Sequence, residues 1–262
     1  MEDLNLHLSE LKRALSGQSF FCKTNLRDFY RSRSPELSEN TFRRILYTLE
    51  KRNLVRKIDR GVYTLGNDQP GHQSQKKFIP TFSTELSALS NSIKAAFPFV
   101  EYLIWETKIL HEFMLHQPGQ NQIILETEKE TADSVFNFLN DRHGGNVFLQ
   151  PDRVTFERYI LSRTDSIIVS NLITQSPHQK VNDIPCPKLE KILVDIYADD
   201  EKFYVFQGQE LVRIFETVFE RYQISEKALF RYAERRKVGT KIHTFVNRET
   251  KIQLFQQIEL SQ

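Results

Sequence analysis

Residues 38–65 read SENTFRRILYTLEKRNLVRKIDRGVYTL, and this stretch decides the predicted fold of the first part of the chain. Ser38 is a residue type that caps helices at their N-termini. Two β-prone runs follow, at 54–58 and 62–65, and Arg60-Gly61 between them offers the glycine that a tight turn needs. The stretch therefore predicts a capped helix followed by a β-hairpin. The apolar stripe of the helix, at i, i+3, i+4 and i+7, is Phe42, Ile45, Leu46 and Leu49.

Two more helices are predicted upstream of this stretch. Leucines at helical spacing, from Leu4 to Leu15, predict a first helix that ends at Gly17. Thr24 can cap a second helix running to about Arg33. The short apolar run Phe20-Phe21 lies between the two. The order helix, short strand, helix, helix, hairpin is that of a winged helix-turn-helix.

A linker is predicted at residues 67–80, NDQPGHQSQKKFIP, because this segment has two prolines, a glycine and no hydrophobic periodicity. It would join a winged helix-turn-helix domain, residues 1–66, to a larger domain, residues 81–262. The predicted fold class is α+β, with a mixed α/β C-terminal domain that ends in a helical cap from Pro187 onward. The strands expected there are Val100–Trp105, Gln122–Thr127, Asn146–Leu149 and Ile167–Ser170, and the helices lie near Lys108–His116 and Lys129–Asp141.

Charge is distributed unevenly along the 262 residues. Residues 1–66 hold 13 Lys and Arg against 8 Asp and Glu, whereas acidic residues are in slight excess in the remainder. A basic N-terminal segment favours a polyanionic partner. No apolar run approaches the roughly 18 residues of a membrane span, and the two cysteines suggest no disulfide framework. We therefore expect a cytoplasmic protein.

The outer face of the third helix predicts contact with double-stranded DNA. At about 100° per residue, polar and cationic side chains lie opposite the apolar stripe. Arg can bind guanine and Asn can bind adenine in the major groove, while cations of the hairpin suit phosphate. The alternatives are a solvated charged face or a surface for protein contact. The predicted DNA-binding residues are Ser38, Asn40, Thr41, Arg43, Arg44, Tyr47 and Lys51 in the helix, and Arg56, Lys57 and Arg60 in the hairpin.

Catalytic and metal sites have weaker signals. The histidines of HEFMLH, His111 and His116, stand at i and i+5, whereas a zinc-protease helix needs i and i+4. Acidic residues beside lysines suggest, as an alternative, a Mg²⁺-dependent nuclease, but the Pro-Asp pair at Pro151-Asp152 follows them instead of preceding them. We predict no cofactor, no metal and no enzymatic activity. The nuclease alternative rests on Glu106, Lys108, Glu126, Glu128 and Lys129.

A basic cluster closes the run FRYAERRK at residues 230–237. Cations at a helix C-terminus complement the helix dipole. Alternatively, these cations form a surface patch that binds an acidic partner or nucleic acid. The residues of this predicted patch are Arg231, Arg235, Arg236 and Lys237.

Three segments together resemble the AbiEi-like antitoxins of type IV toxin–antitoxin systems. They are RGVYTL at the end of the hairpin, WETKILHEFMLHQPG from Trp105, and PKLEKILVDIYADDEKFYVFQGQEL with the later FERYQIS and LFRYAERR. The resemblance implies that the N-terminal domain binds and represses its own promoter. It also implies that the C-terminal domain counters a nucleotidyltransferase-like toxin, with which it need not form a stable complex. A DNA-binding antitoxin is thus the expected function; a nuclease or a pure protein-interaction module are the alternatives.

Overall fold

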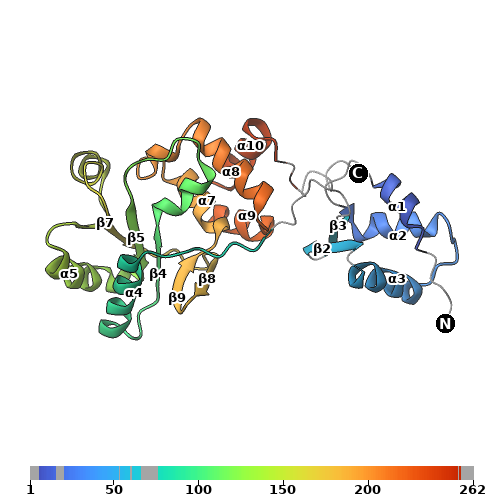
Figure 1. Cartoon of the computed structure of the whole chain (residues 1–262), viewed down its shortest axis with the longest axis horizontal. Coiled ribbons are helices and arrows are strands. Elements are labelled where there is room, and N and C mark those ends of the chain that lie inside the picture. The colour runs from blue at the N-terminus through green and yellow to red at the C-terminus, as the bar shows by residue number, and fades with distance from the viewer. Residues whose placement is uncertain are drawn as a thin grey trace. The chain divides into compact units, whose positions relative to one another are not determined.

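The computed structural model describes residues 6–15, 21–52, 54–59, 61–65, 76–252 and 254, and the chain divides into two compact units (Figure 1). The units are residues 1–74 and 75–262. The predicted linker, 67–80, spans this division. No helix among the described residues is both long enough and apolar enough to cross a bilayer.

The last part of the predicted linker belongs to the larger unit. The Lys76 N–H donates to the Arg221 carbonyl at 3.0 Å, and the Lys76 carbonyl accepts from the Gln223 N–H at the same distance. The Phe78 ring packs edge-on against Tyr222, with centroids 5.1 Å apart. The backbone pairing of Lys76 and the packing of Phe78 thus attach this end of the predicted linker to the larger unit.

The smaller unit has the order of elements on which the winged-helix prediction rests. Three helices and a three-stranded antiparallel sheet, in the order β1-β3-β2, surround one apolar core. Gly61 forms the turn of the hairpin with φ +81°, a value that favours glycine. The elements are α1 (Leu8–Ala14), β1 (Phe21–Cys22), α2 (Lys23–Arg31), α3 (Glu39–Lys51), β2 (Val55–Asp59) and β3 (Val62–Leu65).

Helix α2 begins earlier than the sequence predicted. Cys22, not Thr24, is its N-cap residue, and the Cys22 N–H donates to Asn25 Oδ1 at 2.8 Å. The strand β1 ends at Cys22, so the chain enters the helix directly from the sheet. The predicted boundary residues Leu4, Gly17 and Phe20 lie outside the described residues.

The cap of α3 is confirmed. Ser38 Oγ accepts the Thr41 N–H at 3.1 Å, and the four stripe residues of the helix are buried. We expect Ser38→Ala to cost about 1 kcal/mol, because the Thr41 N–H then loses its acceptor. Hydrogen–deuterium exchange of peptides covering α3 should speed up by about fivefold. Ser34→Ala, in the exposed turn before the cap, is the control and should leave this exchange unchanged.

The larger unit is a sheet covered on both faces by helices (Figure 1). Its strand order is β4-β5-β7-β6, with β4 antiparallel to β5 and the other neighbours parallel. A separate hairpin, β8–β9, was not predicted. The strands are β4 (Tyr102–Glu106), β5 (Gln122–Thr127), β6 (Val147–Leu149), β7 (Ser166–Asn171), β8 (His178–Val181) and β9 (Ile184–Pro187).

Alternation along the strands separates two apolar cores. Ile123 and Leu125 of β5 face α4 and α5, whereas Ile124 faces the C-terminal helices, which form the predicted helical cap. The stretch predicted as a helix near Lys108–His116 is a 3-10 helix, η1 (Thr107–Phe113). The other helices are α4 (Thr84–Ala96), η2 (Lys129–Thr131), α5 (Ala132–His143), α6 (Arg153–Thr155), the π-helix η3 (Phe156–Ile160), α7 (Leu189–Ala198), η4 (Tyr204–Phe206), α8 (Gln209–Arg221), α9 (Glu226–Arg235) and α10 (Gly239–Glu249).

Candidate nucleic-acid interface

The outer face of α3 is a solvent-exposed polar surface on a well-anchored helix. Its apolar stripe is packed into the core of the smaller unit, with Leu49 fully buried. The opposite side carries Tyr47 at its centre, with 64% of its surface exposed. The residues of this outer face, all exposed, are Asn40, Arg43, Arg44, Tyr47 and Lys51.

The arginines of this face are available for a ligand. Within the described part of the chain, neither Arg43 nor Arg44 forms an ion pair or a side-chain hydrogen bond. Ser38 and Thr41 are also exposed, but their hydroxyls lie 2.9 Å apart and both serve the cap. The guanidinium groups are therefore better placed to bind an outside partner than the two cap residues.

The two cations in the described part of the hairpin lie on different faces. Arg56 and Lys57 are neighbours in β2 and so point to opposite faces of the ribbon. Arg56 pairs with Thr64, near the base of the hairpin, and is half-buried, whereas Lys57 is exposed. Arg60 lies outside the described residues. Lys57 is thus the described hairpin cation most open to a phosphate.

The predicted basic patch at the end of α9 does not form one free surface. Arg231, Arg235 and Lys237 are exposed, but Arg236 Nε lies 3.3 Å from Asp195 Oδ1 of α7. The Arg236 side chain is only 22% exposed. Arg236 therefore completes an internal ion pair, which its position in a run of basic residues could not reveal.

The carboxylates of the nuclease alternative do not converge. Glu126 of β5 stands opposite Leu103 of β4, so these two side chains share one face of the sheet. Glu106 is three residues after Leu103 in β4, and side chains alternate between faces along a strand. Glu106 and Glu126 therefore lie on opposite faces. Glu128 and Lys129 are exposed beyond the end of β5. Among the described residues, no group of three His, Cys, Asp or Glu side chains could hold a metal ion.

Glu106 instead fixes the start of α4. Its carboxylate accepts the Ser83 N–H at 3.1 Å and the Ser83 hydroxyl at 2.7 Å, and Ser83 is the N-cap of that helix. Lys108 Nζ lies 2.9 Å from the same carboxylate. Glu106 of the Glu-x-Lys pattern is therefore a buried structural residue that joins β4 to the start of α4, while Lys108 pairs with it from the exposed side of η1.

Glu126 belongs to a buried charge cluster on the other face of the sheet. Lys191 of α7 is fully buried, and its Nζ lies 2.6 Å from Glu126 Oε2 and also contacts Asp195. Asp195 accepts the Tyr232 hydroxyl at 2.8 Å. Burial alone would lower the pKa of Lys191, but the charges of Asp195 and Glu126 outweigh it and raise that pKa. Burial raises the pKa of Glu126, and Lys191 acts against this rise.

Comparison with known protein families matches the chain to "Family of unknown function (DUF6577)" over residues 41–252. The chain belongs to this family. None of the curated proteins matches it. The span shared with DUF6577 begins at Thr41, inside α3, and continues through α10. It therefore includes most of the outer face of α3, the hairpin and the whole described sheet of the larger unit.

Proposed function

We propose that the chain is a non-enzymatic DNA-binding regulator of the antitoxin type. In this proposal α3 enters the major groove of its own promoter, the hairpin contacts the backbone, and the protein represses the operon from the cytoplasm. The observation that carries the proposal is the exposed face of α3, on which Arg43, Arg44 and Lys51 lie opposite a fully packed apolar stripe.

The physical fit to duplex DNA rests on three features of α3. The major groove, about 12 Å wide, admits a single α-helix. The side chains offered are guanidinium, amide and phenol groups, which can hydrogen-bond base edges or phosphates. The apolar stripe anchors the helix, so binding requires ordering of the exposed side chains but not of the helix backbone.

The antitoxin part of the proposal is supported by the resemblance of RGVYTL, WETKILHEFMLHQPG and the block from Pro187 to AbiEi-like antitoxins. In this proposal the larger unit opposes a nucleotidyltransferase-like toxin, with or without a stable complex. The opposite faces of Glu106 and Glu126 give no support to the nuclease alternative.

Binding of the purified chain to its own upstream DNA tests the proposal. Fluorescence anisotropy would compare this duplex with a scrambled one at 50 and 200 mM salt. We expect selective binding that weakens steeply as salt rises, because phosphate neutralisation releases counterions. Equal affinity for both duplexes, or affinity without salt dependence, would instead assign α3 to protein contact.

Lys57→Ala tests the role of the hairpin. Loss of one phosphate contact should make the negative slope of log K against log salt shallower by about 0.9. The affinities for the promoter and the scrambled duplex should fall by the same factor, because phosphate contacts carry no sequence information. Lys129→Ala, exposed in the larger unit, is the control and should leave the slope unchanged. A slope unchanged in both variants would remove Lys57 from the interface.

A further inference from the structure

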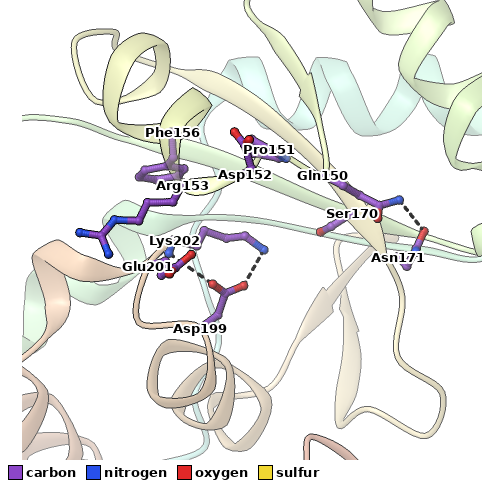
Figure 2. A pocket seen from close by; sticks show the side chains of 10 residues that line it. All are labelled: Gln150, Pro151, Asp152, Arg153, Phe156, Ser170, Asn171, Asp199, Glu201 and Lys202. Atoms are coloured by element: carbon purple, nitrogen blue, oxygen red, sulfur yellow. Dashed lines mark hydrogen bonds and ion pairs between the residues drawn. The ribbon is translucent and has the colours of Figure 1, made fainter.

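A polar hollow of about 260 Å³ lies in the larger unit, outside the carboxyl ends of β6 and β7 (Figure 2). Gln150 directly follows β6, and Ser170 and Asn171 end β7. Asp199 and Lys202, from the segment after α7, line the other side. None of these residues belongs to the candidate DNA interface, so the hollow is a separate feature of the protein.

The chain topology places this hollow where parallel sheets bind ligands. The chain leaves β5 for α5, which packs on one face of the sheet. It leaves β6 for α6 and then η3, whose Phe156 and Ile160 pack on the other face. β7 returns to lie between β5 and β6, so the parallel strands β6 and β7 end side by side at the hollow. Open α/β sheets usually bind their ligands in a crevice outside the carboxyl ends of their strands.

The backbone at the rim of the hollow is strained. Gln150 has φ +42°, in the left-handed region that a residue with a side chain rarely adopts, and its N–H is held by the Val169 carbonyl at 2.8 Å. The π-helix η3 begins at Phe156, three residues after Arg153, and both of these residues line the hollow. Strained residues and π-helical turns both concentrate at functional sites.

Donors and acceptors alternate around the hollow. Lys202 Nζ lies 3.0 Å from Asp199 Oδ2, and Gln150 Nε2 donates to Asn171 Oδ1 at 3.2 Å; Figure 2 shows the two pairs on facing sides. An ammonium has three N–H groups and an amide has two, so each pair retains capacity for a ligand. The Lys202 side chain is only 19% exposed, which strengthens any hydrogen bond it makes there.

The charge of the lining selects against anions. Asp152, Asp199 and Glu201 contribute three carboxylates, and Arg153 and Lys202 contribute two cations, so the formal balance is negative. A hydroxyl group both donates and accepts hydrogen bonds, and therefore suits a wall where both kinds of group stand side by side. The volume is below the roughly 300–1,000 Å³ of sites for drug-sized ligands, so the ligand must be small.

We propose that this hollow binds a neutral, hydroxyl-rich small molecule, namely a sugar ring, either free or as part of a nucleoside. In this proposal the Asp199 carboxylate accepts hydrogen bonds from the sugar hydroxyls, and the Asn171 amide both donates and accepts. The Lys202 ammonium and the Ser170 hydroxyl donate to the sugar oxygens. This assignment does not depend on DNA binding, because every residue in it belongs to the larger unit.

Titration calorimetry of the full chain tests the proposal, with D-glucose, D-ribose, adenosine and ribose 5-phosphate as probes. We expect at least one of the three neutral probes to bind, and ribose 5-phosphate to bind more weakly than ribose. If adenosine binds more tightly than ribose, the hollow is a nucleoside site. If adenosine binds equally or more weakly, the hollow is a site for a free sugar. Asn171→Ala and Ser170→Ala should each weaken the binding by about tenfold, whereas Asn137→Ala, exposed on α5, should not change it.

Three results would overturn the proposal. The first is no heat of binding from any neutral probe at millimolar concentration. The second is tighter binding of ribose 5-phosphate than of ribose, since this would contradict the selection against anions. The third is an affinity that neither Asn171→Ala nor Ser170→Ala alters. The two variants remove different groups, one amide and one hydroxyl, so misfolding of either still leaves a decisive measurement.

Discussion

The double variant Arg43→Ala, Arg44→Ala is expected to weaken binding to the upstream promoter duplex by at least about 30-fold. Each specific contact to a base is worth about 1–3 kcal/mol, and each 1.4 kcal/mol is a factor of ten in affinity. Both side chains are exposed on α3 and contribute nothing to the apolar stripe. Alanine is a strong helix former, so the helix should remain intact.

A matched variant separates sequence recognition from general electrostatics. Arg231→Ala, Arg235→Ala removes the same two charges from the exposed side of α9 in the larger unit. Fluorescence anisotropy at one salt concentration should show little change for this variant. Equal losses in the two double variants would assign the affinity to overall charge. An unchanged affinity after the α3 substitutions would remove this face from the interface.

The features of the smaller unit that the sequence predicted well are local in the chain. The Ser38 cap, the apolar stripe of α3 and the turn at Gly61 each depend on residues within one or two turns of one another. The strand β5 was also placed correctly, because a continuous apolar run with β-branched residues has few alternatives. Short-range spacing and residue type were sufficient for these elements.

Features that depend on distant residues were missed. The partner of Arg236 is Asp195, 41 positions earlier, so a basic run looked like a free patch. Glu106 and Glu126 were grouped because each is an acidic residue near a lysine, but the β4–β5 register puts their side chains on opposite faces of the sheet. The hairpin β8–β9 turns at Asn182 and Asp183, which have φ +49° and +65°, without the glycine that would have marked it.

The polar hollow escaped prediction for the same reason. Its walls come from the ends of β6 and β7 and from the segment after α7, three places that are separate in the sequence. No spacing links Gln150, Asn171 and Lys202. The one indication in the sequence was the alternation of predicted strands and helices. This alternation favours parallel strands, and ligand sites of parallel sheets lie at the carboxyl ends of the strands.

Lys191→Met is expected to destabilise the larger unit by about 3–5 kcal/mol. The substitution keeps the aliphatic stem but leaves Glu126 and Asp195 in the interior without their shared cation. Asp195 retains Tyr232 and Arg236, so Glu126 bears most of the effect. Urea unfolding followed by the fluorescence of Trp105, which packs in the same core, measures the loss. Lys188→Met, exposed three residues earlier, is the control and should stay within about 0.5 kcal/mol.

The pH dependence of Lys191→Met identifies which carboxylate causes the loss. Burial already raises the pKa of Glu126, and removal of Lys191 raises it further. A group whose folded-state pKa exceeds its unfolded value stabilises the fold below the unfolded pKa and loses that stabilisation as pH rises. The variant should therefore be less impaired at pH 5 than at pH 8. Adding Glu126→Gln should recover part of the loss at pH 8 and abolish this difference; a loss that is equal at both pH values would place the cost in packing instead of charge.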